Sequence, residues 1–570
     1  MDMKKRIAER IASAAQRSFE GCAITAQELA AMLEIPPEKK LGDFALPCFR
    51  LSKTLRKAPP MIAAALSAHL ACEEIDHVEV VGGYLNVFLS RTFLARSIVE
   101  AVLEQPGRWG SSDIGRGKTV CLDYSSINIA KRFHIGHLST TMLGHSLKRI
   151  YDFNGYTTVG INHLGDWGTQ FGKMICAYKK WGSREAVEAG GVQAMVDLYV
   201  RFHQEAEKDP ALEDEGRAWF KKIEDGDPEA MEIFTWFKEV TLKDTQRVYD
   251  LLGVTFDSYA GESFYNDKMQ PVIDELREKG LLTKSQGAEV VMLEDYGMPP
   301  ALVLRSDGAT LYITRDLAAA FYRQNTYHFD KCLYVVAYQQ NLHFKQLFKI
   351  IELMGYDWCK GMEHVSFGMV SYEGRALSTR EGYVVYLEDL LNKAIEKARE
   401  IIEQKSPNLP NKDEVARQVG VGAVVYFDLH NDRNKDIDFR WERALNFDGE
   451  TGPYVQYTHA RCCSVLRKAG EVGAAPDYAA LTDDEASDVL MLLSRFPETV
   501  RKAMEQSEPS LITRHTTQLA QAYNKYYFEH RIVEEGDAQG TAARLALTSA
   551  VRDVIKTGLY LIGVEAPERM

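Results

Sequence analysis

The stretch that decides the fold begins with Thr119-Val-Cys-Leu-Asp-Tyr124 and continues Ser-Ser-Ile-Asn128-Ile-Ala-Lys131-Arg-Phe-His134-Ile-Gly136-His137-Leu138. Its first six residues are apolar and β-branched, which predicts a β-strand. From about His137 to Phe153 apolar residues recur at helical spacing, and Asn154-Gly155 ends the pattern. The stretch is therefore predicted to run strand, turn and helix.

The turn of this unit carries residues suited to bind phosphate. A helix N-terminus presents unpaired amides and the positive end of the helix dipole, and together these bind anions. His134 and His137 are three residues apart, so both imidazoles lie near one side of the first turn, and Gly136 lets a nucleotide approach the backbone. Two histidines at this spacing are also found as a solvated pair or a metal site. The strand–turn–helix context favours nucleotide binding.

Strand-like and helix-like segments alternate around this unit. A further helix is predicted at Leu342–Met354, and further strands at Tyr156–Asn162, Cys332–Ala337 and Val365–Val370. Such alternation predicts a parallel, doubly wound α/β sheet, which we place at residues 116–390. Between about Trp181 and Gly253 the sequence turns helical and charged, and we interpret residues 181–253 as an insertion into the sheet.

The two ends of the chain differ from the middle. Near the N-terminus, helical segments precede His77–Leu89, where apolar alternation is broken by Gly82-Gly83, the pattern of a β-hairpin. From about residue 390 nearly every segment is helical in pattern, with breaks such as Gly449–Pro453. We expect an α+β N-terminal domain at residues 1–115 and an all-helical C-terminal domain at 391–570.

Composition limits the class of protein. The 570 residues are too many for one core, and 45% hydrophobic and 26% charged residues are typical of globular proteins. No apolar run approaches the roughly 20 residues that span a bilayer, and the N-terminus lacks a signal-peptide core. The nine cysteines are scattered and never spaced Cys-x-x-Cys, which argues against a disulfide framework and a zinc knuckle. We expect a cytoplasmic protein with no membrane partner and no structural metal.

Short motifs connect the chain to a known family. His134-Ile-Gly-His137 resembles the HIGH motif of class I aminoacyl-tRNA synthetases and related nucleotidylyltransferases. The run Asn128–Leu138, followed by Asn162-His-Leu-Gly-Asp-Trp-Gly-Thr-Gln-Phe-Gly172, resembles arginyl-tRNA synthetases in particular. Other similar stretches are spread along the whole chain, at Gly42–Cys48, Ser306–Asp316, Asn446–Tyr457 and Gly563–Met570.

The resemblance implies a fold, an activity and partners. The fold would be α/β, with a Rossmann-type parallel-sheet catalytic domain, an N-terminal domain that touches the tRNA elbow, and a helical domain that binds the anticodon. The activity would be ATP-dependent activation of L-arginine, with Mg²⁺, and transfer to arginine tRNA, and we expect a monomer. Because the net charge is −13, RNA would have to be bound by local basic faces.

The family's functional positions carry over to this chain residue by residue. The residues implied in catalysis are His134, His137, Lys131 and Arg380. ATP would also contact Gly136, Ser378 and Thr379. The residues implied in arginine binding are Asp123, Asn128, Glu262, Tyr312, Asp316 and Gln340. The residues considered for tRNA binding are Tyr84, Asn86, Tyr454, Tyr457 and Arg461.

These implied roles are chemically reasonable. A guanidinium presents a planar fork of donors, which a bidentate carboxylate matches. The resemblance accordingly places Asp316 and Glu262 at the guanidinium, with Tyr312 one helical turn before Asp316. The histidines and cations would stabilise charge on phosphate oxygens and on the leaving pyrophosphate.

Several positions depart from the family's pattern. Ile127 and Arg132 stand where the family usually has a proline, and Ser139 stands where it has an arginine. Ala337 and Gln339 replace a glycine and an acid. The loop usually written KMSKS is degenerate here, because Ala376-Leu-Ser378-Thr-Arg380 lacks the first lysine, and the resemblance suggests that Lys131 supplies that charge. Two alternatives stay open, namely another class I synthetase and an inactive, synthetase-like RNA-binding paralogue.

Overall fold

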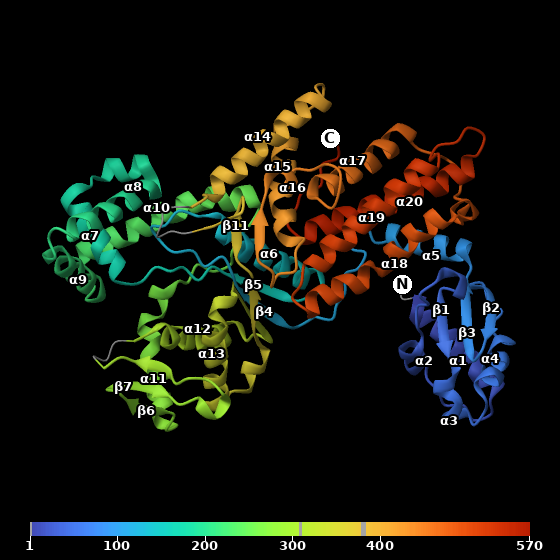
Figure 1. The fold of residues 1–570 in the computed structure, drawn as a ribbon, viewed down its shortest axis with the longest axis horizontal. Coiled ribbons are helices and arrows are strands. Elements are labelled where there is room, and N and C mark those ends of the chain that lie inside the picture. Colours follow the sequence, from blue (N-terminus) through green and yellow to red (C-terminus); the bar gives the residue numbers. More distant parts are fainter. Residues whose placement is uncertain (1–2, 307–309, 378–383) are drawn as a thin grey trace.

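A four-stranded parallel sheet lies at the centre of the molecule (Figure 1). The structure, a computed structural model, describes residues 3–306, 310–377 and 384–570. The strand order is β10-β9-β4-β5, with bounds β4 (Thr119–Asp123), β5 (Thr157–Ile161), β9 (Lys331–Ala337) and β10 (Met362–Phe367). The helices that flank the sheet are α6 (Leu138–Phe153), α11 (Met269–Glu278), α12 (Tyr312–Tyr327) and α13 (Asn341–Leu353).

The two faces of this sheet belong to different cores. Cys121 of β4 lies in an apolar cluster with α11, α12 and α13, whereas the next residue, Leu122, lies in the larger cluster that contains α6. A parallel strand covered on both faces carries a continuous apolar run, which is what Thr119–Asp123 shows. With α6 joining β4 to β5 and α13 joining β9 to β10, the prediction of a doubly wound α/β sheet is confirmed.

The strand predicted at Val365–Val370 is divided between two sheets. β10 ends at Phe367, and Val370 begins a second sheet of order β12-β11-β13. Between them, a Cβ on Gly368 would lie 2.3 Å from the carbonyl oxygen of Lys435, so a side chain cannot fit there. The bounds of this second sheet are β11 (Val370–Tyr372), β12 (Arg375–Ala376) and β13 (Ile437–Phe439). The region expected to be all helical, 391–570, therefore contributes one three-residue strand.

Two groups of elements lie on the left of Figure 1. The upper group is helical, with α7 (Thr169–Trp181), α8 (Arg184–Ala206), α9 (Ala211–Glu224) and α10 (Pro228–Leu252). Gly253 ends α10 in the left-handed conformation, with φ of 66°. The lower group adds a small antiparallel sheet that the sequence did not predict, with β6 (Leu282–Ser285), β7 (Ala288–Val291) and β8 (Ala301–Leu304).

The N-terminal region forms a separate body at the lower right of Figure 1. Its antiparallel sheet has the order β1-β3-β2, with β1 (Phe44–Pro47), β2 (Ile75–Val81) and β3 (Tyr84–Leu89). Because β2 and β3 pair across Gly82-Gly83, the predicted hairpin is confirmed. The helices of this body are α1 (Met3–Ser18), α2 (Ala26–Met32), α3 (Ser52–Leu55) and α4 (Pro59–Ser67). The next helix, α5 (Arg91–Leu103), packs against α18 and α20 of the C-terminal region.

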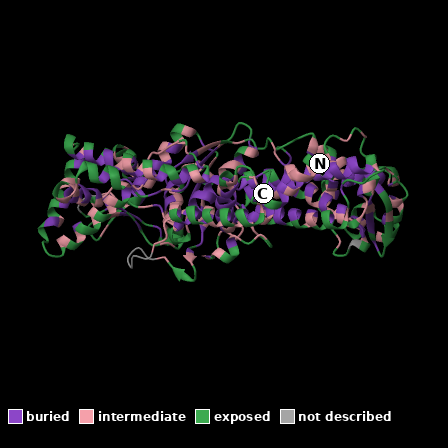
Figure 2. Ribbon diagram, turned by 90° about the horizontal axis from the view of Figure 1, so that it is seen from above, coloured by how far each residue is buried: buried purple, intermediate pink, exposed green. Residues whose placement is uncertain are grey.

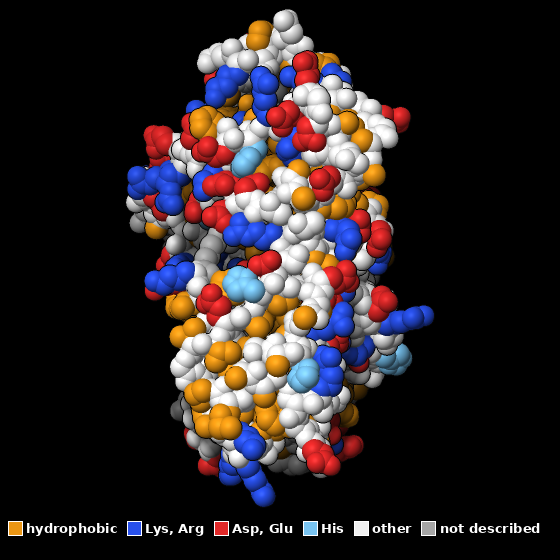
Figure 3. Space-filling view, turned by 90° about the vertical axis from the view of Figure 1, so that its right-hand side faces the viewer, with side chains coloured by type: hydrophobic (Ala, Val, Ile, Leu, Met, Phe, Trp, Pro, Cys, Tyr) orange, Lys and Arg blue, Asp and Glu red, His pale blue; other side chains and the backbone are white. Residues whose placement is uncertain are grey.

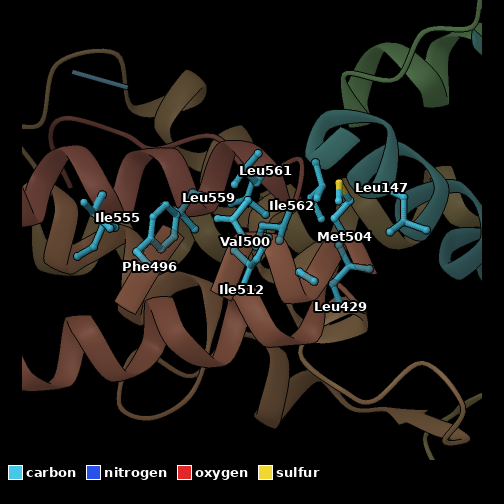
Figure 4. Close-up of a cluster of buried hydrophobic side chains, with 14 of the residues drawn as sticks. Leu147, Leu429, Phe496, Val500, Met504, Ile512, Ile555, Leu559, Leu561 and Ile562 are labelled. Atoms are coloured by element: carbon cyan, nitrogen blue, oxygen red, sulfur yellow. The ribbon is translucent and has the colours of Figure 1, made fainter. Parts of the chain in front are cut away.

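The C-terminal helices pack directly onto the sheet region. Their bounds are α14 (Leu387–Lys405), α15 (Lys412–Leu429), α16 (Trp441–Ala444), α17 (Gly452–Ala469), α18 (Asp484–Glu505), α19 (Ser510–Glu529) and α20 (Ala538–Leu561). Figure 4 shows one apolar cluster formed by Leu147 of α6, Leu429, Val500, Ile512 and Leu559. Buried residues accordingly run along the length of the molecule (Figure 2). No helix in the described ranges is long and apolar enough to cross a membrane.

Candidate active site

The phosphate-binding end of the site is the turn between β4 and α6. After Asp123 the backbone takes left-handed conformations at Ser125, Ser126 and Ala130, with φ of 69°, 44° and 60°. Such conformations are strained for residues other than glycine and occur where a loop is held by its surroundings. One 3₁₀ turn, η3 (Ile135–His137), then leads into α6.

Backbone hydrogen bonds orient both imidazoles. The amide of Gly136 donates to Nδ1 of His134, and the amide of His134 donates to Nδ1 of His137, each over 3.1 Å. The two ring centroids are 3.9 Å apart. Because Nδ1 accepts a hydrogen bond in each ring, the proton of a neutral imidazole resides on Nε2. Both histidines thus keep an Nε2–H donor for a ligand.

Burial keeps both imidazoles neutral. It lowers the pKa of His137 to about 3, and the neighbouring His134 and Lys131 add to the shift. Burial, followed by the positive charge of Lys131, also lowers the pKa of His134. At neutral pH the pair therefore acts through hydrogen bonds, while Lys131 carries the positive charge.

Gly136 is required by the position of its neighbour. A Cβ at this residue would lie 2.9 Å from Cε1 and Nδ1 of His134, closer than side chains approach one another. The His134 ring occupies that space because it accepts the amide proton of Gly136. Only glycine fits between the two histidines.

Lys131 is exposed beside the histidines, and within the described part of the chain it makes no ion pair. The other three residues expected at this end, Ser378, Thr379 and Arg380, lie outside the described residues. The backbone that follows them is bound to the histidine segment. Ile135 donates to the carbonyl of Val385, and Leu387 donates to the carbonyl of Phe133, both over 2.9 Å.

The carboxylate end of the site lies on α12 and on η4 (Glu262–Lys268). Tyr312 is the first residue of α12, and Asp316 follows one turn later, as expected. Oδ2 of Asp316 accepts a 2.6 Å hydrogen bond from Nε2 of His343. Glu262 lies 3.7 Å from the guanidinium of Arg315. Tyr312 is 70% exposed, so its ring is open to solvent at the edge of this end.

The two carboxyl groups have shifted pKa values of opposite sign. Burial raises the pKa of Glu262 to about 7, and although Arg315 opposes the rise, Asp316 and Asp166 add to it. Burial alone would also raise the pKa of Asp316. The hydrogen bond and charge of His343, with further charges nearby, more than offset that effect, so the pKa of Asp316 lies below its ordinary value. Asp316 is ionised at neutral pH, and Glu262 is poised between its two states.

Three further residues were expected to bind arginine. Asp123 ends β4, Asn128 is exposed in the following turn, and Gln340 is exposed at the N-terminus of α13. β4 and β9 are neighbours in a parallel sheet, so all three lie at its carboxyl edge, where such sheets bind ligands. Asp123 is 6% exposed, and its oxygens already accept hydrogen bonds from Arg323 and Ser126, each 2.7 Å long.

Sequence reasoning missed the partners of the acids. Arg323 is 1% exposed and holds Asp123, while His343 and Arg315 hold Asp316 and Glu262. One signal was present, because Arg323 follows Asp316 by seven residues and therefore shares its face of α12. His343 carried no such signal, since its pairing depends on how α12 and α13 pack.

The two N-terminal residues considered for RNA contact differ in their exposure to solvent. Tyr84, the first residue of β3, is 39% exposed on the body whose apolar side chains gather over the lower half of Figure 3. Asn86, two residues on, is only 4% exposed, because β1 and β2 flank it in the central strand. The expectation that Asn86 contacts RNA is therefore not supported by its position.

The C-terminal candidates meet around an open pocket. Arg461 stacks over the rings of Tyr457 and Tyr527, at 4.9 and 5.3 Å from their centroids. The hydroxyl of Tyr454 accepts a 3.0 Å hydrogen bond from Asn524. Tyr457 and Arg461 line a pocket of about 540 Å³ whose other basic residues are Arg467, Lys468 and Arg569. This is a local basic face on an acidic protein, as RNA contact requires.

Comparison with known protein families matches all three regions of the chain to domains of tRNA synthetases. Residues 1–89 match the arginyl tRNA synthetase N terminal domain, residues 98–441 match the catalytic domain of class I (R) tRNA synthetases, and residues 455–570 match the DALR anticodon binding domain. The catalytic match thus extends past residue 390 to include α14, α15 and β13.

Whole-chain relatives agree with these matches. The chain is 53% identical to the arginine–tRNA ligase of Alkaliphilus metalliredigens over 573 residues, covering 100% of both chains. It is 54% identical to that of Clostridioides difficile, covering 96% of this chain and 97% of the relative. The solved arginyl-tRNA synthetase of Thermus thermophilus superimposes with a TM-score of 0.80 at 27% identity over 100% of both chains. This chain belongs to the arginyl-tRNA synthetase family.

Proposed function

We propose that this arginine–tRNA ligase divides its chemistry between the two ends of one site along the carboxyl edge of the central sheet. The chain activates L-arginine with ATP to arginyl-adenylate and transfers the arginyl group to its tRNA. The observation that carries the division is the contrast between two neutral Nε2–H donors at one end and two carboxyl groups at the other. Nothing in the comparisons favours another class I synthetase or an inactive paralogue.

At the phosphate end, His134 and His137 donate to phosphate oxygens of ATP. Neutral donors held by the backbone need not reorganise as negative charge grows in the transition state. Lys131, with Arg380, supplies the positive charge for the leaving pyrophosphate, and Gly136, Ser378 and Thr379 complete the nucleotide contacts. Mg²⁺ bound with ATP would be held mainly by phosphate oxygens, because the described residues here offer imidazoles and amides rather than free carboxylates.

At the carboxylate end, Asp316 and Glu262 bind the guanidinium of arginine, with Tyr312 beside them. A guanidinium loses its hydration here only if both acids pair with it, so a neutral analogue would leave a carboxylate unpaired. Asn128 and Gln340 hold the α-amino and carboxylate groups. Asp123 has the weakest support for direct contact, because Arg323 and Ser126 already occupy its oxygens.

The two ends of the chain bind tRNA in this proposal. Tyr84 presents a ring on the N-terminal body. In the helical region, Tyr457 and Arg461 line the basic pocket described above, and together with Tyr454 they line an adjoining pocket. Exposed rings stack on unpaired bases and arginines pair with phosphates. We propose domains at about 1–115, 116–390 with the insertion 181–253, and 391–570, in a monomer that works in the cytoplasm.

The test is ATP–pyrophosphate exchange with arginine, with and without arginine tRNA. We expect exchange that depends on the tRNA, and none with lysine or citrulline in place of arginine. Wild-type exchange with citrulline would overturn the role of the two carboxyl groups. ATP binding without exchange under either condition would overturn the roles given to the histidines and cations.

A further inference from the structure

Arg132 lies between the catalytic turn and α14, and three side chains hold its guanidinium group. The guanidinium carbon stacks 3.6 Å from the centroid of the Tyr386 ring. One nitrogen lies 3.6 Å from Asp389 in the first turn of α14, and another donates over 3.4 Å to Gln193 of α8. The Arg132 side chain is only 22% exposed although it carries a charge.

These contacts fall where two backbone segments join. His134 and Tyr386 form an isolated antiparallel bridge, closed on either side by the hydrogen bonds of Ile135 to Val385 and of Leu387 to Phe133. Arg132 thus stacks on the side chain of the residue that pairs with His134. A movement at Tyr386 would shift the backbone that orients the His134 ring.

The stacking contact is the main part of this arrangement. Asp389 is 66% exposed, and an ion pair with an exposed carboxylate contributes little. A guanidinium stacked on an aromatic ring and largely shielded from water contributes more, and its planar shape fixes the relative orientation of the two groups.

Arg132 is also unsuited to bind phosphate itself. Its charge is shared between the Tyr386 ring, Asp389 and Gln193. Lys131, its neighbour, lies close enough for its charge to lower the pKa of His134 and His137, and it makes no ion pair within the described ranges. Of the two adjacent cations, Lys131 is therefore available for phosphate and Arg132 is not.

We propose that Arg132 is a positioning residue for arginine activation, which clamps Tyr386 and so holds His134 in its donating orientation. The inference rests on the proposed role of His134. A proline at position 132 would fix the backbone of this segment by its ring. Here the same segment is fixed from outside, by a side chain that reaches across to α14.

The experiment measures kcat and KM for ATP–pyrophosphate exchange in the full-length enzyme with arginine tRNA. Arg132→Ala is expected to lower kcat about tenfold, since small misplacements of catalytic groups carry large rate losses, while the KM for arginine stays unchanged. Arg399→Ala is the matched control, because Arg399 is exposed on the same α14 and pairs with Asp413. It should leave both constants at wild-type values.

Substitutions of the partner test the clamp itself. Tyr386→Phe keeps the ring and should stay within about twofold of wild type, whereas Tyr386→Leu should lose about as much as Arg132→Ala. The double variant Arg132→Ala/Tyr386→Leu should lose no more than either single variant, because one contact cannot be removed twice.

A proline rescue separates positioning from direct contact. The φ of Arg132 is not positive, and among the backbone hydrogen bonds of the described residues none is donated by its amide, so proline can be accommodated. Arg132→Pro should therefore recover most of the kcat that Arg132→Ala loses. A loss in Arg132→Pro as large as in Arg132→Ala would contradict positioning and favour direct contact with substrate.

His134→Ala distinguishes failure of the clamp from failure of the proposed function. Lost exchange in His134→Ala together with wild-type kcat in Arg132→Ala, or additive losses in the double variant, overturns the clamp alone. Wild-type exchange in His134→Ala overturns the role of His134, and the clamp that rests on it falls with it.

Discussion

Burial shifts pKa values at both the phosphate end and the carboxylate end of the site, yet it has opposite consequences for their functions. At the phosphate end, burial lowers the pKa of His137 to about 3 and so preserves the neutral donor that the chemistry needs. At the carboxylate end, burial raises the pKa of Glu262 to about 7 and works against the charge that a guanidinium needs. The same desolvation supports one function and opposes the other.

The difference explains why the two ends are built from different partners. The histidines need only backbone amides, which His134 and Gly136 provide from within the same turn. Asp316 keeps its charge because His343 reaches it from another helix. An enclosed donor can be made locally, whereas an enclosed charge requires tertiary contacts.

The largest effect is expected from a substitution at the carboxylate end. Asp316→Asn removes the ionised partner of the guanidinium and should lower kcat/KM for arginine about 10³-fold in tRNA-dependent exchange, because the guanidinium is left enclosed without its charge pair. Asp357→Asn is the control, since Asp357 is exposed and its one ion pair among the described residues is with Lys360. An Asp316→Asn enzyme within tenfold of wild type would show that the guanidinium binds elsewhere.

The next largest effect is expected from substitutions of His137 at the phosphate end. His137→Asn keeps an acceptor near the Nδ1 position but removes the Nε2–H donor, and should lower kcat by about 10² to 10³ with little change in the KM for arginine. His137→Gln places an amide NH₂ near Nε2 and should retain more activity than His137→Asn. Equal losses in the two variants would argue against donation from Nε2.

A third test concerns a buried charge behind the phosphate end. Ser139 donates over 2.6 Å to Asp428 of α15, and burial raises the pKa of Asp428 to about 6. Because this value exceeds that of an unfolded chain, the stability contributed by protonated Asp428 is complete below pH 4 and is lost as the pH rises through about 6. Asp428→Asn keeps the shape without the charge, so it should stabilise the protein by about 2 to 3 kcal/mol at pH 8.

Thermal denaturation of both proteins at pH 5 and pH 8 measures this effect. The advantage of Asp428→Asn should be larger at pH 8 than at pH 5. An advantage that does not grow with pH would mean that folding does not raise the pKa of Asp428.

The smallest expected effect is a change with pH in the KM for arginine of the unmodified enzyme. Glu262 is protonated below about pH 7 and ionised above it, so the KM for arginine should fall about tenfold between pH 6 and pH 8. Glu262→Gln should make this KM independent of pH in the same range. His137, with its pKa near 3, should contribute no pH dependence to kcat there. A KM that rises with pH would contradict the assignment of Glu262.

Local sequence patterns predicted the parts of the fold that are locally determined. The strand 119–124, the hairpin at Gly82-Gly83 and the start of α6 near His137 all follow from periodicity and turn residues. β13 has three residues and pairs with a strand more than sixty residues earlier, so no local pattern marks it. The β6-β7-β8 sheet was not predicted for a related reason, since its four-residue strands are too short to show a clear alternation of apolar and polar residues.

The site residues likewise fall into those that sequence motifs predicted and those that depend on tertiary packing. Residues implied by motifs, such as His134, His137 and Asp316, occupy one edge of the sheet together with Gln340. Their partners Arg323 and His343 depend on which helices meet, and that is a tertiary property. Asn86 shows the converse, because strand alternation turns it to the same face as the exposed Tyr84, but flanking strands cover it.

The second sheet has a consequence for how the protein is made. Ser371 of β11 donates a hydrogen bond to Asp438 of β13, its partner in the sheet, which is synthesised 67 residues later. At about 5 to 20 residues per second, β11 leaves the ribosome about 3 to 13 s before its parallel partner exists. The catalytic region therefore cannot finish folding as a free N-terminal fragment during translation. The sheets of this region are therefore completed only after α14 and α15, which precede β13 in the chain, have been synthesised.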